Sequence, residues 1–402
     1  MTKPTLEEFE REIQTFFDDV LPPVLDGITG DVRRAKAWRA ALYDNDLAGL
    51  DYPTEVGGRS LDPDHIDLWR RQSRGRVPRE DSVFGIGVGM ALPTIRDYGT
   101  DELKERFIRP GLRGEEIWCQ MYSEPGSGSD LASLSTKAIR DGDEWVVTGQ
   151  KVWTSGAHHA QFAILLARTD VDAPKHRGIT MFVLPVEQDG VTVRPLVQMT
   201  GASEFNEVFL DEARIPASWV VGEVNGGWAT AVALLAHERV QTGTASMSGS
   251  ATQRSKAGRS PIPVAQLIEL AERQDRLTDP VVRQDLARLH AGERVVAWLG
   301  ARGVHPSIGK LWRTKQGRAA ADLAARLAFP ASPAWSTDLD GPAADRNRDD
   351  DYFAYHILNC RGMSLGGGTD EIQRNTLGER ALGLPREPGP DRNTPFKDLL
   401  NN

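Results

Sequence analysis

The clearest signal of secondary structure in the sequence is "STKAIRDGDEWVVTGQKVW" at residues 135–153. It contains two runs rich in β-branched and aromatic residues on either side of an Asp-Gly pair, a pattern typical of two antiparallel strands joined by a tight turn. Four further strand-like runs follow: "FAILLAR", "GITMFVLPV", "VTVRPL" and "FNEVFL". Short strands at this spacing predict a small antiparallel β-barrel or sandwich, which we place at residues 117–222.

Helical patterns flank this β-region on both sides. Residues 1–116 carry apolar residues at helical spacing, and "TDELKERFIRPGLRG" at 100–114 begins with a Thr cap and ends with Gly. Residues 223–402 contain four long helical stretches whose lengths suit a bundle. A Pro- and Asp-rich segment at 332–351 predicts an irregular surface excursion within that bundle. The expected fold class is therefore α+β multidomain: an N-terminal helical domain, a central β-domain and a C-terminal helical bundle.

Composition narrows the class of protein. A chain of 402 residues with 40% hydrophobic and 26% charged residues is typical of a globular protein with two or three domains. The net charge of −9 argues against a general nucleic-acid surface. The first residues lack a secretory signal, and no window reaches 18 uncharged apolar residues, so we expect a cytoplasmic location without a membrane span. Cys119 and Cys360 are too few for a disulfide framework and are expected to be buried thiols.

A run of three glycines, residues 366–368, precedes a polar helical segment in "SLGGGTDEIQRN". Glycines before a helix leave backbone N–H groups open to an anion, which would suit a phosphate-bearing ligand. A plain turn explains the same pattern. The pair His158 and His159 has no carboxylate or Cys at metal-ligand spacing, so we expect no metal there.

Three long motifs in the chain carry a resemblance to a known family. They are "WCQMYSEPGSGSDLAS" at 118–133, "GQKVWTSGAHHAQFAILLARTD" at 149–170 and "GGGTDEIQRNTLGERALGLP" at 366–385. Together they resemble the acyl-CoA dehydrogenases, and the match looks closest to the actinobacterial type. The resemblance implies FAD-dependent α,β-desaturation of an acyl-CoA thioester, with removal of an α-proton by a base and hydride transfer to flavin N5. It also implies electron transfer to an electron-transfer flavoprotein, a role in fatty acid or lipid catabolism, and a homodimer or homotetramer.

The resemblance assigns cofactor-binding roles to two segments of the β-domain and one of the bundle. In the first segment the hydroxyl of Ser123 is expected near flavin N5, and Ser129 near the cofactor phosphates and the CoA of the substrate. In the second segment Trp153 is expected to cover one face of the flavin ring. The full set of expected flavin contacts in these segments is Gln120, Met121, Tyr122, Ser123, Ser129, Trp153, Thr154, Ser155, Thr369 and Glu371.

The position of the catalytic base is unusual. In many relatives a glutamate occupies the middle of the glycine segment, where this chain has Gly367. Glu238 in "LLAHERVQTG" aligns with the helix position from which isovaleryl-type relatives supply their base, and the adjacent Arg239 matches a recurring Arg at the substrate site. Gly367 would keep the backbone N–H that hydrogen-bonds the thioester carbonyl in the family, an oxyanion-hole role.

The chain also departs from the family in segments that touch a neighbouring subunit. Many relatives have Arg-x-x-Phe-Gly where this chain keeps only Arg273, while Gln284 retains its place as an FAD contact. The Gln-x-x-Gly-Gly segment usual before the last motif is replaced by residues 332–351. Two alternatives therefore stay open: a non-catalytic partner subunit in a mixed tetramer, and a flavin monooxygenase on the same fold.

Overall fold

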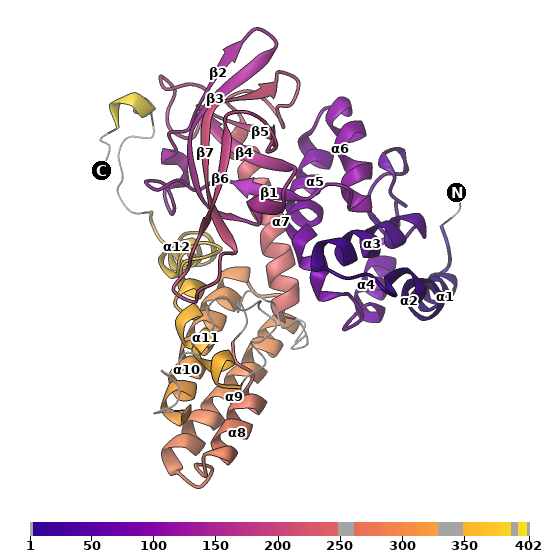
Figure 1. Cartoon of the computed structure of the whole chain (residues 1–402). Helices are drawn as coiled ribbons and strands as arrows, with labels where there is room; N and C mark the ends of the chain where they lie inside the picture. The colour runs from indigo at the N-terminus through magenta and orange to yellow at the C-terminus, as the bar shows by residue number, and fades with distance from the viewer. Residues whose placement is uncertain (1–2, 248–260, 329–348, 387–392, 400–402) are drawn as a thin grey trace. The chain divides into compact units, whose positions relative to one another are not determined.

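The computed structural model describes residues 3–247, 261–328, 349–386 and 393–399 of the chain. Two compact units are distinguished. The first comprises residues 1–196, 204–238 and 389–402, and the second comprises residues 197–203 and 239–388. In order along the chain, an N-terminal helical region, a central β half-barrel and a C-terminal helical region follow one another (Figure 1). The predicted fold class is confirmed.

Two of the N-terminal helices, α1 and α6, begin at side-chain caps. Thr5 and Glu8 form a reciprocal capping box at the start of the first helix, and Thr100 accepts a hydrogen bond from the backbone N–H of Leu103 at 3.3 Å. Such caps satisfy backbone donors that the first turn of a helix leaves free. The helices are α1 (Leu6–Thr15), α2 (Leu21–Leu25), α3 (Asp31–Asp44), α4 (Pro63–Gln72), α5 (Leu92–Tyr98) and α6 (Asp101–Arg113).

The central sheet has seven strands: β1 (Trp118–Met121), β2 (Lys137–Asp141), β3 (Glu144–Ser155), β4 (Phe162–Arg168), β5 (Ile179–Pro185), β6 (Val191–Leu196) and β7 (Phe205–Pro216). The predicted hairpin is present, since Asp141 pairs with Glu144 and Gly142 has the left-handed φ of +58° that such a turn requires. The sequence predicted an antiparallel sheet, and this prediction is wrong at one place. Strand β4 pairs in parallel with β1 and, at one position, with β2. The long connections between these strands permit the parallel pairing.

Both faces of the sheet are covered by apolar packing within the first unit. On one face, strands β1, β4 and β5 share a core with the N-terminal helices and with α7 (Gly227–Met247). On the other face, side chains from β1, β3, β4, β5 and β7 form a second core, which includes Cys119. Cys119 and Cys360 are both buried free thiols, as expected. This double packing fixes the sheet as a rigid support for the loops at its edge.

The second unit is built from helices α8 (Val264–Arg273), α9 (Pro280–Ala301), α10 (Pro306–Ala328), α11 (Asp349–Asn359) and α12 (Asp370–Thr376). Apolar side chains from α8, α9, α10 and α11 form its core. The bundle predicted from helix lengths is therefore present. The excursion predicted at 332–351 is wrong for its last three residues, which begin α11, because these three aspartates lie at the N-terminus of the helix, where acidic residues are favourable. The remainder lies outside the described residues.

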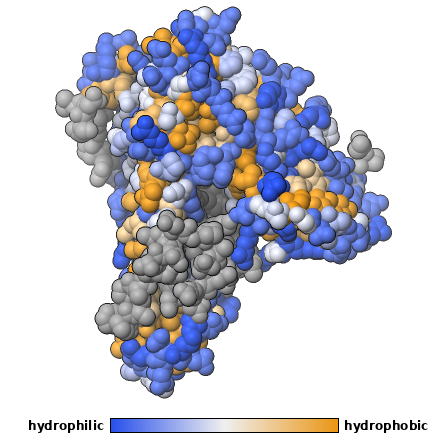
Figure 2. All heavy atoms as spheres, in the orientation of Figure 1, coloured by the Kyte–Doolittle hydropathy of each residue, from blue (hydrophilic) through white to orange (hydrophobic). Residues whose placement is uncertain are grey.

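The visible surface is mainly polar, with apolar side chains reaching it over the central sheet (Figure 2). In the described ranges, no helix combines the length and the apolarity that a membrane crossing requires.

Candidate active site

The first part of the candidate site is the turn that leaves strand β1. The carbonyl of Ser123 accepts a hydrogen bond of 2.9 Å from the backbone N–H of Val152, which joins this turn to strand β3. Glu124 and Ser127 exchange two backbone hydrogen bonds, each of 3.0 Å, and so close a tight turn. Two segments that the sequence assigned separately to flavin binding are thus held side by side.

The glycines of this turn face open space. A Cβ added at Gly126 or Gly128 would meet no described atom within 4 Å, and both residues are exposed. Internal packing therefore does not explain why they lack side chains. Their absence leaves an accessible backbone beside Ser129, which is also exposed, and this arrangement can accept a ligand that needs close approach to the main chain.

A buried ion pair fixes the turn from beneath. Lys151 is fully buried on β3, and its Nζ lies 2.8 Å from Oε1 of Glu124 and 3.1 Å from the carbonyl of Tyr122. The Glu124 carboxylate also accepts hydrogen bonds from the backbone N–H groups of Ser135 (2.7 Å) and Thr136 (2.9 Å). Burial alone would raise the pKa of Glu124, but the Lys151 charge and these hydrogen bonds hold that pKa at about 2. The carboxylate is therefore ionised at neutral pH.

Trp153 is displayed by a distorted part of β3. The register of β3 against β7 shifts between Lys151 and Thr154, as in a β-bulge, and Trp153 has a φ of +60°. A bulky residue in the left-handed region is strained, and bulges commonly redirect side chains beside active sites. Trp153 is 55% exposed, and its ring lies edge-to-face with the ring of Phe205, with 5.8 Å between the ring centroids. The strand thus presents a large aromatic face to solvent at a cost in backbone strain.

The other expected flavin contacts of the first unit differ in accessibility. Gln120 and Ser155 are half-buried, whereas Met121, Tyr122 and Thr154 are buried. Alternation along β3 places Trp153 and Ser155 outward and Thr154 inward. The Oγ1 atom of Thr154 has no hydrogen-bond partner among the described residues.

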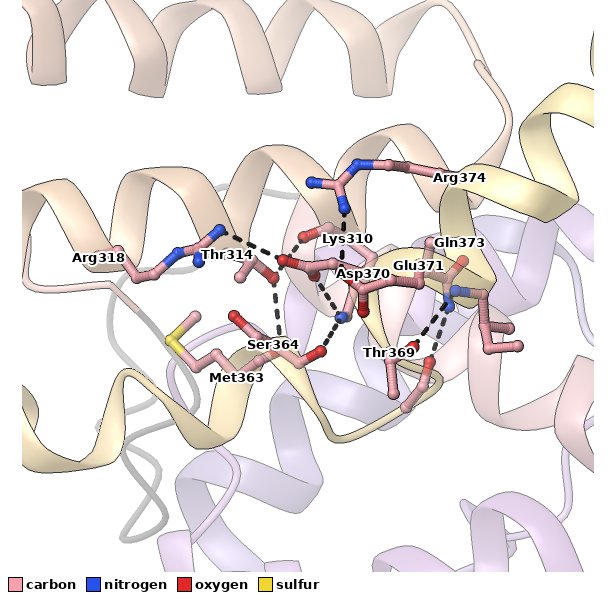
Figure 3. Close-up of polar contacts among 12 residues, drawn as sticks. Lys310, Thr314, Arg318, Met363, Ser364, Thr369, Asp370, Glu371, Gln373 and Arg374 are labelled. Carbon is pink, nitrogen blue, oxygen red and sulfur yellow. Dashed lines mark hydrogen bonds and ion pairs between the residues drawn. The ribbon is translucent and has the colours of Figure 1, made fainter. Parts of the chain in front are cut away.

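The glycine run belongs to the second unit and is held by its own helix (Figure 3). Gly367 and Gly368 have φ values of +66° and +82°, so both need the freedom of glycine. The side-chain amide of Gln373 donates a hydrogen bond of 2.8 Å to the carbonyl of Gly367. Thr369 caps α12 by accepting a hydrogen bond from the backbone N–H of Ile372 at 3.2 Å.

The N–H of Gly367 makes no hydrogen bond to any described residue, and the glycine run is exposed. The carbonyl of the same residue, which belongs to the next peptide group, is held by Gln373, so the backbone is anchored directly after this donor. The glycines therefore have two roles: the backbone conformation of Gly367 and Gly368 excludes most side chains, and the N–H of Gly367 is a donor without a partner among the described residues.

An ion-pair cluster anchors the start of α12 to α10 (Figure 3). Asp370 is 4% exposed, and its carboxylate lies 2.8 Å from Nζ of Lys310 and 3.3 Å from the guanidinium of Arg318. Lys310 also donates a hydrogen bond of 3.3 Å to the carbonyl of Ser364, just before the glycines. Charges on α10 thus hold the glycine run from both of its ends.

The expected base and its neighbour lie on α7. Glu238 and Arg239 are helical residues whose side chains fall outside the described part of the structure. The preceding residue, His237, is described, and its Nε2 lies 3.2 Å from Oδ2 of Asp97 on α5. This contact anchors α7 immediately before Glu238.

The remaining expected cofactor contacts are exposed residues of the second unit. Arg273 ends α8, and Gln284 lies on the first turns of α9. Glu371 lies in the first turn of α12, and its carboxylate is 3.2 Å from Arg374. Each is accessible to a ligand or to another chain.

Sequence reasoning missed Lys151, Gln373 and Asp370. The signal for Lys151 was available, because a lysine on the inward face of an alternating strand requires a buried partner. No comparable signal marks Asp370, which looks like an ordinary first-turn acid. His158 and His159 lie near one another, and the described residues hold no group of three or more potential metal ligands.

Comparisons with known proteins identify the family of this chain. The profile for the N-terminal domain of acyl-CoA dehydrogenases matches residues 3–115, and the profile for the middle domain matches residues 119–213. The acyl-CoA dehydrogenase IpdE1 of Mycobacterium tuberculosis is 35% identical over 406 residues, covering 95% of this chain and 98% of IpdE1. The chain belongs to the acyl-CoA dehydrogenase family, a family that typically binds FAD.

Two further relatives differ in the share of their own length that this chain covers. The acyl-CoA dehydrogenase FadE34 of M. tuberculosis is 38% identical over 354 residues, covering 87% of this chain, but this chain spans only 46% of its length. Among solved structures, the Tcur3481–Tcur3483 steroid ACAD has 26% identity and a TM-score of 0.70, with coverage of 96% of this chain and 99% of that chain. The family resemblance seen in the sequence motifs is confirmed.

Proposed function

We propose that this protein catalyses the FAD-dependent α,β-dehydrogenation of an acyl-CoA thioester to the trans-2-enoyl-CoA. The observation that carries the proposal is the pair of segments on the β-sheet edge: an open glycine turn after Ser123, tied to a strained bulge that displays Trp153. Strain of this kind persists where function requires it. A plain structural strand would place an aromatic residue of this size inward.

The residues present fit FAD. In the first unit, Gln120, Ser123, Trp153 and Ser155 offer side chains at the sheet edge, and Ser129 with its neighbouring glycines offers a backbone suited to phosphate. We assign only backbone contacts to Met121 and Thr154, since their side chains are fully buried. We assign the remaining cofactor contacts to Tyr122 in this unit and to Arg273, Gln284, Thr369 and Glu371 in the second. When bound, FAD would accept the β-hydrogen as hydride.

The chain's own residues would supply the proton chemistry and the charge stabilisation. The available N–H of Gly367 would donate to the thioester carbonyl and stabilise the developing enolate, which makes the α-proton more acidic. Glu238 would remove that proton as general base, and substrate burial would desolvate its carboxylate and strengthen it as a base. Arg239 would contribute to substrate binding beside it. The missing acid at 367 would thus be replaced from another helix.

The experiment is anaerobic mixing of the purified, FAD-loaded chain with a panel of acyl-CoA thioesters. Loss of the oxidised flavin absorbance together with enoyl-CoA formation is the expected result. Protein that binds FAD but is not reduced by any thioester would contradict the proposed reaction. Oxygen consumption with product hydroxylation would instead identify a flavin monooxygenase. Electron transfer to an electron-transfer flavoprotein is tested by adding that protein to the reduced enzyme.

We further propose that the acyl group is bulky. Support comes from the absence of a side chain at Gly367, where many relatives carry glutamate, and from similarity to a protein described as a steroid ACAD. The thioester panel should therefore include steroid side-chain CoA esters next to short straight-chain esters. A clear preference for the short esters would contradict this choice of substrate.

A second candidate is a subunit of a mixed acyl-CoA dehydrogenase assembly. It is supported by the loss of the Phe-Gly that usually follows the position of Arg273, and by the naming of the similar steroid ACAD for two proteins. We expect a dimer or tetramer in either case. Light scattering combined with flavin quantification separates the candidates. A homo-oligomer holding one FAD per active chain supports the enzyme, whereas FAD uptake that occurs only with a second, related chain supports the mixed assembly.

A further inference from the structure

The end of the chain returns to the β-sheet unit. Residues 393–399, which we call the C-terminal clasp, pack along the loop 169–178 between β4 and β5. Pro395 bridges Pro174, and the backbone N–H of Phe396 donates a hydrogen bond of 2.9 Å to the carbonyl of Ala173. A second backbone hydrogen bond, from Lys397 to the carbonyl of Val171, measures 3.0 Å. The clasp, which contains a 3-10 turn at Phe396–Asp398, is thus fixed to this loop by one bridge and two backbone hydrogen bonds.

The clasp also covers a buried cation. The ring of Phe396 lies over the guanidinium of Arg168, with the guanidinium carbon 3.9 Å from the ring centroid. Arg168 is 2% exposed, and burial lowers its pKa to about 10. Among the described residues, no carboxylate hydrogen-bonds this guanidinium, although the charges of Glu124 and Asp170 act on it without direct contact. Its direct contacts are backbone carbonyls and the face of the ring. A cation–π contact is strongest at such a desolvated site.

The same guanidinium organises the segment that follows the glycine turn. Arg168 donates hydrogen bonds to the carbonyls of Ala132 (2.6 Å) and Leu134 (3.2 Å) on one side, and to the carbonyl of Lys175 (2.7 Å) on the other. Lys175 in turn pairs with Asp130 at 2.6 Å. Asp130 directly follows Ser129, the residue expected to meet the phosphates.

We propose that the C-terminal clasp, acting through Phe396 on Arg168, positions the turn at residues 129–134 for the phosphate-bearing end of the cofactor and substrate. Phe396 and Arg168 are positioning residues and need not touch either ligand. The assignment of the ligand rests on the proposed function, whereas the mechanical link between the clasp and the turn does not. Removing the ring would admit water to the guanidinium, which would then compete for the carbonyls of Ala132 and Leu134.

The test compares Phe396→Ala with Lys397→Ala in the full chain. Lys397 is a matched control, because within the described ranges its side chain makes only an exposed ion pair with Asp172, and its backbone hydrogen bond survives the substitution. Hydrogen–deuterium exchange of the amides at 130–135 reports the turn directly. We expect exchange at least fivefold faster in Phe396→Ala and unchanged in Lys397→Ala. Phe396→Tyr, which keeps the ring, should exchange like the parent.

FAD affinity is the second readout, measured by the quenching of flavin fluorescence without turnover. We expect the dissociation constant to rise roughly fivefold or more in Phe396→Ala. Unchanged exchange at 130–135 in this variant would show that the clasp does not position the turn. Faster exchange with unchanged FAD affinity would overturn the link to the phosphate-bearing ligand. If the parent takes up no FAD, the proposed function fails, but the exchange experiment still decides the clasp. Should Phe396→Ala not fold, Phe396→Leu removes the π-face while keeping apolar volume and takes its place.

Discussion

Replacing Lys151 by methionine should destabilise the β-sheet unit by roughly 3–5 kcal/mol. The substitution conserves the length and apolar character of the stem but leaves the carboxylate of Glu124 without its cation in a site where only 7% of the residue is exposed. Lys151 is itself fully buried, so no water can take the place of its ammonium without rearrangement. Breaking one side of a buried pair is costly for this reason, even when the intact pair contributes little net stability.

The pKa of Glu124 gives a second value for the folding free energy that the ionised carboxylate contributes. The pKa of this carboxyl is about 2 in the folded protein, whereas its ordinary value is 4.5. This difference corresponds to about 3 kcal/mol of folding free energy at neutral pH. Because the folded pKa is depressed, this stabilisation is present above pH 4.5 and is lost as the pH falls towards 2. The stability difference between the parent and Lys151→Met should therefore narrow on acidification, by roughly 1 kcal/mol at about pH 3.5.

Equilibrium urea unfolding at pH 7 and at acidic pH measures both effects. The double variant Lys151→Met/Glu124→Gln is the control, since it removes the stranded charge and should recover part of the loss. A loss below about 1 kcal/mol at pH 7, or a difference that does not narrow on acidification, would show that Lys151 does not stabilise the buried carboxylate of Glu124.

Three further predictions concern the ligand-facing segments. Trp153→Gly should relieve the strained φ of +60°, so the stability of the apoprotein should be unchanged or slightly higher, while FAD binding weakens. Equal FAD affinity of the variant and the parent in a fluorescence titration would argue against Trp153 as a cover for the flavin ring. Gly368→Ala should destabilise by about 1–2 kcal/mol in thermal unfolding, because φ is +82° and the new Cβ would lie 2.8 Å from Nε2 of Gln373, whereas Gly366→Ala should be nearly neutral. His237→Ala should lower kcat roughly tenfold with a small change in KM, because α7 loses its contact with Asp97 beside the expected base. Recovery of kcat in His237→Gln would support a positioning role for His237. An unchanged kcat in His237→Ala would contradict that role.

Most of the fold follows from local patterns. The hairpin at Gly142, the cap at Thr100 and the long helices after residue 223 each depend on residues close together in sequence. The parallel pairing of β1 with β4 does not, because the partner strand starts more than 40 residues later and no local signal specifies it.

The candidate site was only partly predictable for the same reason. Sequence motifs identify the glycine turn and Trp153, but the strained φ of Trp153 arises from a bulge whose position depends on pairing with β7. The ion pair between Lys151 and Glu124 joins residues 27 positions apart. The contact of Phe396 with Arg168 joins the end of the chain to its middle, and only the three-dimensional structure reveals it.

The proposed role of Glu238 as the base is tested by the rate of flavin reduction in Glu238→Gln. The substitution keeps the size and polarity of the side chain and removes its basicity. On a thioester that reduces the parent, stopped-flow measurement should show a reduction rate lower by roughly 10²–10⁴-fold, with FAD content and flavin spectrum unchanged. A reduction rate close to that of the parent would show that Glu238 is not the base and that the acid missing at Gly367 has not been replaced from α7.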